Sequence, residues 1–314
     1  MDDSPTGHGT MMAGIIAAEI NNSQFFAGIA PNVRIMPIKV VDRNGASHAS
    51  DIAEGIDFAV DHGADLISVS VGSYLTSDMV KTAIYNAYDH GILVIAAVGN
   101  ERTTKATIPA CYQETLSVTG VRRFADYIVF ADMFSNYGPD LTSSTRSPWV
   151  TAPAVDIWST NSTRYGNATG IASGTSFATP IVSAAVALIL GYATHRKIDL
   201  HPELILWLLQ ASARDLGPKG WDPYYGYGLV NVSRAIELIK SMGNVTISRE
   251  NSVPGVSLQL NTKSQHYICS SPTTSEVGRV IARTIRPKEQ PQRVRKTEYV
   301  TFRNWNPRDR LIKT

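Results

Sequence analysis

The sequence predicts an α/β protein built on a mostly parallel sheet. Strand-like apolar runs alternate with helix-length segments over residues 1–243, the pattern of strands joined by crossover helices. The chain has 314 residues, of which 43% are hydrophobic and 18% charged, enough to bury a large core. The alternation stops after Gly243. We therefore expect a large domain at residues 1–243 and a C-terminal extension of unknown structure at 244–314.

Five apolar runs are the expected strands, and six segments with apolar residues three and four positions apart are the expected helices. The strands are Val33–Val41, Asp65–Val71, Ile92–Val98, Thr115–Val121 and Trp149–Ala152. The helices are Thr10–Glu19, Ser50–His62, Ser77–His90, Phe177–Tyr192, Pro202–Ser212 and Val232–Met242. The longest apolar run, Pro180–Ala193, is shorter than a bilayer needs, so we expect a buried helix and no transmembrane segment.

The balance of basic and acidic residues also changes at the boundary between residues 243 and 244. Residues 244–314 hold 13 Lys and Arg against 5 Asp and Glu, whereas the rest of the chain holds 16 against 22. The basic run Arg293–Lys296 suits nucleic acid or a membrane surface, but a solvated extension is the commoner case, and we expect no nucleic-acid partner. Cys111 and Cys269 fall in different units and are expected to be separate thiols. The first residues show no signal-peptide pattern.

Three residues stand where catalytic groups would be useful. Ser176 directly precedes an apolar helix, whose N-terminus supplies N–H donors and a positive dipole end. His8 precedes another helical pattern, and Asn100 follows the strand Ile92–Val98. Taken singly, a helix cap, an ordinary histidine and a Gly-Asn turn are the commoner interpretations. Their joint occurrence in the order His, Asn, Ser, with whole strand–helix units between them, favours catalysis.

In this joint form the chain resembles the subtilisin-like serine proteases, or subtilases, of peptidase family S8. The matching motifs are Gly7–Thr10 (GHGT), Ala97–Asn100 (AVGN) and Gly174–Pro180 (GTSFATP), of which the last is the most specific. The resemblance covers about three quarters of the chain. It implies a three-layer subtilisin-like fold with a mostly parallel central sheet, whose first strand is missing from this chain, followed by a C-terminal tail.

The resemblance also implies roles for these residues. Ser176 would attack a peptide carbonyl to form an acyl-enzyme, His8 would act as general base and then general acid, and Asn100 would donate to the oxyanion. The protein would then be a serine endopeptidase that needs no cofactor for its chemistry. In subtilisin, loss of the oxyanion asparagine lowers turnover by about 10²- to 10³-fold.

Polypeptide substrates would bind as an extra strand between two segments of the chain, with little sequence preference. These segments and the primary pocket are formed by Asn44, Gly45, Ala46, Ser47, His48, Ser70, Val71, Gly72, Ala97, Val98, Gly99 and Thr107. None of these is acidic, so we expect an apolar or broad preference. Asn22 matches a ligand of a structural calcium site in some subtilases. Ile108-Pro109 falls where relatives have a cis-proline. The resemblance also implies that the protein is secreted.

The aspartate of the triad has no counterpart at the expected position, because only seven residues precede His8. Asp2 and Asp3 lie there, but no predicted strand leads to them. We therefore expect the catalytic aspartate upstream of Met1, in a longer protease. The alternative is a non-catalytic subtilase-like protein that binds peptides or regulates. An α/β-hydrolase esterase is disfavoured, because its histidine follows its serine.

Overall fold

The computed structural model describes Asp2, residues 6–23, 26–138, 149–162 and 168–242, and the backbone of residues 299–303. Asp3, Cys269 and most of the predicted extension lie outside the described residues. The boundary between residues 243 and 244 therefore stays a prediction. Cys111 is a half-buried free thiol.

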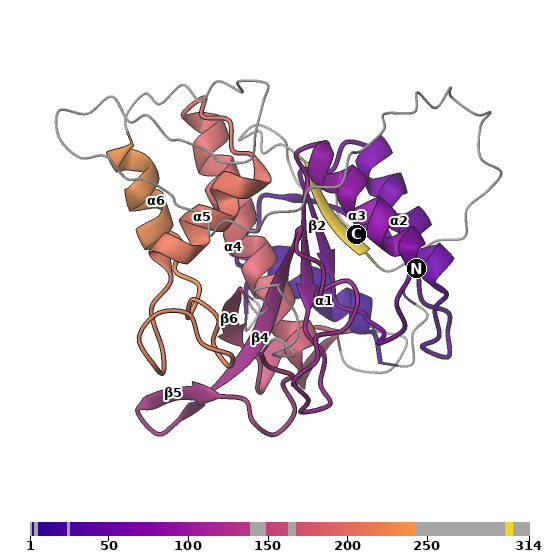
Figure 1. Cartoon of the computed structure of the whole chain (residues 1–314), viewed down its shortest axis with the longest axis horizontal. Coiled ribbons are helices and arrows are strands. Elements are labelled where there is room, and N and C mark those ends of the chain that lie inside the picture. The colour runs from indigo at the N-terminus through magenta and orange to yellow at the C-terminus, as the bar shows by residue number, and fades with distance from the viewer. Residues whose placement is uncertain are drawn as a thin grey trace, which may run out of the picture.

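A central sheet separates two layers of helices (Figure 1). Helices α2 (Ala49–Asp61) and α3 (Asp78–Asp89) cover one face. The other face carries α1 (His8–Ala17), α4 (Thr175–His195), α5 (Pro202–Ser212) and α6 (Val232–Ser241). Successive residues of a strand supply the two cores in turn, so that Leu66 packs with α4 and Ile67 with α2 and α3. The expected three-layer fold is confirmed.

The sheet is mostly parallel, as predicted, in the order β1-β9-β2-β3-β4-β5, with β6 paired to β4. Strands β2, β3, β4 and β6 pair in the parallel sense. Strand β9 lies between β1 and β2 and is antiparallel to both. The bounds are Arg34–Ile38 for β1, Leu66–Val69 for β2, Leu93–Ala97 for β3, Thr115–Phe124 for β4, Tyr127–Phe130 for β5, Val150–Pro153 for β6 and Tyr299–Arg303 for β9.

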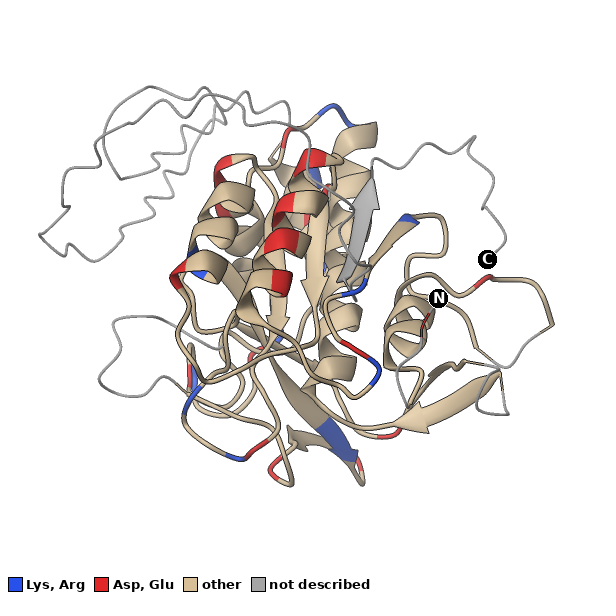
Figure 2. Cartoon of the chain, turned by 90° about the vertical axis from the view of Figure 1, so that its right-hand side faces the viewer, with Lys and Arg blue, Asp and Glu red and all other residues tan. Residues whose placement is uncertain are grey.

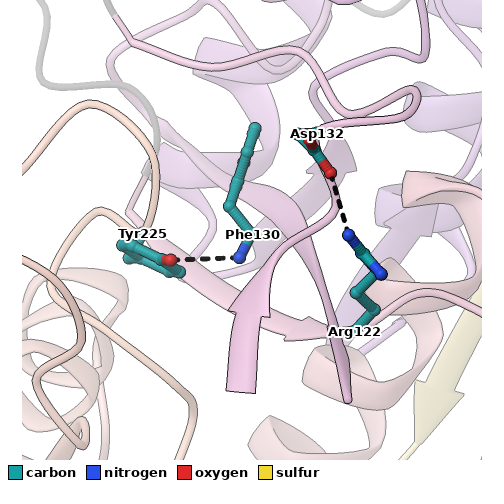
Figure 3. Close-up of polar contacts among 4 residues, drawn as sticks. All are labelled: Arg122, Phe130, Asp132 and Tyr225. Carbon is teal, nitrogen blue, oxygen red and sulfur yellow. Dashed lines mark hydrogen bonds and ion pairs between the residues drawn. The ribbon is translucent and has the colours of Figure 1, made fainter. Parts of the chain in front are cut away.

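Two hairpins were not predicted from the sequence. Strand β4 turns back into β5, and the backbone N–H of Phe130 in β5 donates to the Tyr225 hydroxyl at 3.0 Å (Figure 3). Arg122 and Asp132 form an exposed ion pair beside it, 3.5 Å from Nη2 to Oδ1. The second hairpin joins β7 (Ile157–Thr160) to β8 (Thr169–Ala172). Strands β5, β7 and β8 are short and half-exposed, so their apolar pattern is weak.

Helix α4 runs through the core. By length and composition it could cross a membrane, but 72% of its most apolar window is buried inside the protein, as in the core helix of a soluble domain. The prediction of a buried helix at Pro180–Ala193 is thus consistent with its position in the fold. The helix begins two residues earlier and ends three residues later than the predicted Phe177–Tyr192.

Acidic residues are concentrated on the layer formed by α2 and α3 (Figure 2). Both helices carry acidic residues in their first turns, Asp51 and Asp78. Along α2 the series continues with Glu54, Asp57 and Asp61. This layer accounts for part of the excess of acidic over basic residues in the segment 1–243.

Candidate active site

Ser176 is the second residue of α4, and its half-exposed side chain lies at the helix N-terminus. The residue before the helix, Gly174, has φ 151°, a conformation that side chains rarely adopt. The first N–H groups of a helix have no partner within it, and the dipole makes this end positive. An anionic oxygen that forms beside Ser176 would therefore be stabilised by the backbone.

Ser70 and Ser176 are joined by two reciprocal hydrogen bonds. The Ser176 hydroxyl donates to the Ser70 carbonyl at 3.2 Å, and the Ser70 hydroxyl donates to the Ser176 carbonyl at 2.9 Å. Pro180 explains the second bond: it has no N–H for the carbonyl four residues earlier, so that carbonyl needs another donor. The pair attaches the segment after β2 to the start of α4.

Asn100 is held with its amide oxygen against the start of α4. Its Oδ1 accepts from the backbone N–H of Thr175 at 2.8 Å and from the Thr175 hydroxyl at 3.0 Å. Within the described part of the chain no partner accepts from its Nδ2, and the residue is exposed. The fold thus uses the acceptor half of the amide for positioning and leaves the donor half for a ligand, as an oxyanion hole requires.

The loop that carries Asn100 is built around Asn136, whose side chain is fully buried. Asn136 Oδ1 accepts from the backbone N–H groups of Glu101 and Thr103 at 2.9 and 3.1 Å, and Nδ2 donates to the Val98 carbonyl at 3.0 Å. A side chain at Gly99, which has φ 108°, would overlap Asn136 Nδ2. Asn136 lies outside the three motifs and was not predicted as a site residue.

Glu101 adds a charged partner to this loop. Its Oε2 accepts from the Tyr74 hydroxyl at 2.6 Å, from Asn136 Nδ2 at 2.9 Å and from the Asn100 backbone N–H at 2.8 Å. Burial raises the pKa of Glu101, but these hydrogen bonds outweigh it and leave the pKa below its usual value. Burial and the Glu101 carboxylate raise the pKa of Tyr74 to about 12, so this hydroxyl stays protonated and remains a donor.

His8 is the first residue of α1, and its ring meets Phe177 edge-on at a centroid distance of 6.0 Å. Phe177 directly follows Ser176, so α1 and α4 bring the imidazole to the first turn of the helix that carries the nucleophile candidate. Burial lowers the pKa of His8, and the negative charge of Asp2 opposes this in part. The net shift favours the neutral imidazole at pH 7, the form that can accept a proton.

Asp2 caps α1. Gly7, which precedes the helix, has no side chain to cap it, and Asp2 Oδ2 accepts from the Thr10 backbone N–H and hydroxyl, each at 2.8 Å. These bonds place a carboxylate at the helix N-terminus, close enough to affect His8. The sequence contained both residues, but their proximity depends on how the chain turns into α1.

The β7–β8 hairpin holds α1 in place. The Ser159 hydroxyl donates to the Met11 carbonyl at 2.5 Å, and the Thr160 hydroxyl donates to the Thr10 carbonyl at 2.8 Å. The same hairpin leads into α4, so one connection fixes the positions of both His8 and Ser176.

The three wall segments of the predicted primary pocket meet in the structure. The Thr107 backbone N–H donates to the Val98 carbonyl at 2.9 Å, and its hydroxyl donates to the Ala97 carbonyl at 3.1 Å. A Cβ on Gly72 would overlap the Thr107 side chain, which places Ser70–Gly72 against this residue. The Ile108-Pro109 peptide bond is cis, as the resemblance implied.

The other predicted binding residues lie further out. Residues 44–48 form an exposed loop between β1 and α2, organised by Asp42, whose Oδ1 accepts from the backbone N–H groups of Asn44 and Ala46 at 2.8 and 2.9 Å. A role for this loop as one edge of a substrate channel stays a prediction. Asn22 lies in an exposed turn. Among the described residues, no cluster of three His, Cys, Asp or Glu could hold a metal ion. The calcium assignment also stays a prediction.

The structure supplies the parts of a serine hydrolase site. They are a hydroxyl at a helix N-terminus, an amide donor beside it and a neutral imidazole on the neighbouring helix. Their setting is a mostly parallel sheet covered by helices on both faces. Comparison with known families makes the class specific: the chain belongs to the subtilase family, whose peptidase S8 model matches residues 2–228.

Named relatives agree with this assignment. The thermophilic serine proteinase of Bacillus sp. (strain AK1) is 36% identical over 231 residues, which cover 73% of this chain and 52% of the relative. Subtilisin E of Bacillus subtilis (strain 168) is 35% identical over 237 residues, covering 74% of this chain and 56% of the relative. The chain thus matches little more than half the length of these proteins.

Solved structures show the same fold. The prenylagaramide maturation protease PagA superposes with a TM-score of 0.62 at 31% identity, covering 74% of this chain and 81% of that structure. Sphericase superposes with a TM-score of 0.65 at 26% identity, covering 73% and 78%.

Proposed function

We propose that the protein is a serine endopeptidase that acts through Ser176, His8 and Asn100. The position of Asn100 carries the proposal: its amide oxygen is fixed by Thr175 at the start of α4, and its Nδ2 is left to donate beside Ser176. Membership of the subtilase family and the names of the relatives support peptidase activity in general.

In this proposal His8 removes the proton from the Ser176 hydroxyl as the oxygen attacks the peptide carbonyl. The carbonyl electron pair moves onto its oxygen, where Asn100 Nδ2 and the N-terminus of α4 stabilise the negative charge. Collapse of this intermediate breaks the C–N bond, and the protonated His8 gives its proton to the leaving amine. Water then attacks the acyl-enzyme in the same way and frees Ser176.

The third member of the triad is proposed to come from residues that precede Met1 in the complete protein. Asp2 is engaged by Thr10 at the N-terminus of α1, and Asp3 lies outside the described residues. N-terminal sequencing of the natural protein tests this point. A natural product that starts at Met1 would contradict it.

We also propose an apolar or broad preference at the primary pocket. The wall residues Ser70–Gly72, Ala97–Gly99 and Thr107 carry no charge, and the nearby Glu101 carboxylate is already engaged by three donors. Cleavage-site mapping on an unfolded protein substrate checks this. A strict requirement for Lys or Arg before the cleaved bond would contradict it. Secretion, which the family resemblance implies, stays a prediction.

Hydrolysis by paired variants tests the catalytic roles. Ser176→Ala should abolish cleavage of an unfolded protein substrate, whereas Ser241→Ala, an exposed serine on α6, should not change it. Asn100→Ala should lower kcat by about 10²- to 10³-fold, whereas Asn86→Ala on α3 should not. Equal activity of Ser176→Ala and the natural chain would refute the proposal.

One observation favours the alternative of a peptide-binding protein without turnover. The Ser176 hydroxyl donates its hydrogen to the Ser70 carbonyl, and an attacking serine must instead pass that hydrogen to a base. The alternative predicts that a fluorescent peptide binds with a measurable rise in anisotropy and remains intact. Release of cleaved fragments in the same sample would exclude it.

A further inference from the structure

Tyr74 follows one wall of the predicted primary pocket, and the backbone before it is fixed. The wall Ser70–Gly72 continues into Ser73, whose N–H donates to the Ile108 carbonyl at 3.2 Å and whose carbonyl accepts from the Ile108 N–H at 2.7 Å. Ile108 in turn follows the pocket residue Thr107. Tyr74 therefore starts from a fixed point of the pocket, although 45% of the residue is exposed.

The Tyr74 hydroxyl reaches the loop that carries Asn100. It donates to Glu101 Oε2 at 2.6 Å, the oxygen that also accepts from the Asn100 backbone N–H at 2.8 Å. Asn136 Nδ2 lies 2.7 Å from the Tyr74 hydroxyl and 2.9 Å from Glu101 Oε2. A side chain that follows one pocket wall is thus hydrogen-bonded to the carboxylate that holds the backbone of Asn100, at the end of another wall.

The Glu101 carboxylate needs such a partner. Glu101 is exposed, and a long exposed side chain loses conformational entropy when it is held in one position. Tyr74, by contrast, is a rigid aromatic side chain. Because hydrogen bonds keep the pKa of Glu101 below its usual value, the carboxylate is charged at neutral pH, and the bond from Tyr74 is of the stronger, charge-assisted kind. Tyr74 therefore restricts a side chain that would otherwise sample several rotamers.

Asn100 is held at two points. Its side-chain Oδ1 accepts from the N–H and the hydroxyl of Thr175 at the start of α4, and its backbone N–H donates to Glu101. These two attachments together set the direction of Nδ2, the donor proposed for the oxyanion. A donor of this kind lowers the barrier only when it is aimed at the position where the negative charge develops. If the backbone attachment loosens, Nδ2 can turn away while Oδ1 stays bonded.

We propose that Tyr74 is a positioning residue for the oxyanion donor: through Glu101 Oε2 it holds the backbone of Asn100, and so the direction of Asn100 Nδ2. The kinetic role rests on the proposed function, whereas the connection from Tyr74 to the Asn100 loop does not. Tyr74 itself touches no reacting atom. Its hydroxyl should therefore affect turnover only while Asn100 is present, and should affect kcat more than KM, because the oxyanion forms only after the substrate is bound.

A double-mutant cycle in the complete protein tests the kinetic role. Tyr74→Phe should lower kcat by about tenfold, within the limit of about 10²- to 10³-fold that loss of the asparagine sets, and should change KM by less than about twofold. In the Asn100→Ala background the same substitution should change kcat by less than about twofold. Tyr127→Phe, at an exposed tyrosine on β5, is the control and should change neither constant. An unchanged kcat in Tyr74→Phe, or an equal loss in both backgrounds, would overturn the proposal.

Hydrogen exchange of the Asn100 backbone N–H, followed by NMR, tests the connection without turnover. Tyr74→Phe should make this exchange about fivefold faster or more, whereas exchange in β3 should stay unchanged, and Tyr127→Phe should alter neither. Unchanged exchange at Asn100 in Tyr74→Phe would overturn the proposal. Faster exchange in a protein that hydrolyses no substrate would support the connection, but would refute the proposed function and with it the kinetic role of Tyr74.

Discussion

At the scale of single residues, the charge state of His8 depends on the burial of its ring and on Asp2. Burial lowers the pKa of His8 and the Asp2 carboxylate raises it. Asp2→Asn keeps an oxygen that can accept from Thr10 but removes the charge, so the His8 pKa should fall further. NMR titration of the imidazole measures this, with Asp132→Asn on the distant β5 hairpin as the control. An unchanged or higher pKa in Asp2→Asn would contradict the account.

The Ser70 side chain provides a second residue-level prediction. Ser70→Ala removes the donor to the Ser176 carbonyl, which Pro180 leaves without a helical partner. The free energy of unfolding should fall by about 1 to 3 kcal/mol, the cost of a polar group left unpaired. Urea unfolding checks this against Ser73→Ala, a serine three residues away whose hydroxyl accepts from the nearby Leu75 N–H. Equal stability of the two variants would show that the carbonyl needs no such donor.

At the scale of elements, the contact between α1 and the β7–β8 hairpin positions the catalytic candidates. Gly14 lies at this contact, where a Cβ would overlap the side chains of Ser159 and Thr160. Alanine favours a helix over glycine by about 1 kcal/mol, but overpacking costs about 1 to 3 kcal/mol. Gly14→Ala should therefore lower the thermal unfolding midpoint despite its better helix propensity.

A double-mutant cycle separates the overlap from other effects of Gly14→Ala. Thr160→Ala removes the nearest overlapping atom, so the double variant should lose less stability than the sum of the two single variants. Strict additivity would place the cost of Gly14→Ala elsewhere.

At the scale of the whole molecule, stability should depend on pH through His8. The folded pKa of His8 lies below the 6.5 expected of the unfolded chain, so the unfolded state binds more protons at mildly acidic pH. The contribution of His8 to the free energy of unfolding should be independent of pH well above 6.5 and should decrease as the pH falls through 6.5. Denaturant unfolding in steps from pH 8 to pH 5 measures this. His8→Gln should flatten the slope, and an unchanged slope would contradict the assignment.

The sequence predicted the parts of the fold that have strong local patterns. Strands β2 and β3 are buried on both faces and read as continuous apolar runs, whereas β5, β7 and β8 are half-exposed and lack such a pattern. Strand β9 pairs with residues more than 200 positions away, and no local signal in YVTFR indicates that partner. The boundary at residue 243 describes composition and does not show where this strand lies.

The candidate site likewise has residues that the sequence could predict and residues that it could not. Ser176, His8 and Asn100 stand in motifs that could be found in the sequence. The reciprocal bonds of Ser70, the support of the Asn100 loop by Asn136 and the cap from Asp2 depend on segments brought together by folding. Asn136 lies more than 30 residues from the loop it supports, so spacing alone could not reveal it.

Labelling with a fluorophosphonate probe tests the central claim most directly, because this reagent reacts with an activated serine. The account predicts one adduct on the complete protein, located on Ser176 by mass spectrometry, absent from Ser176→Ala, much slower in His8→Gln and unchanged in Ser241→Ala. A chain that forms no adduct at Ser176, or that labels equally fast without His8, would contradict it.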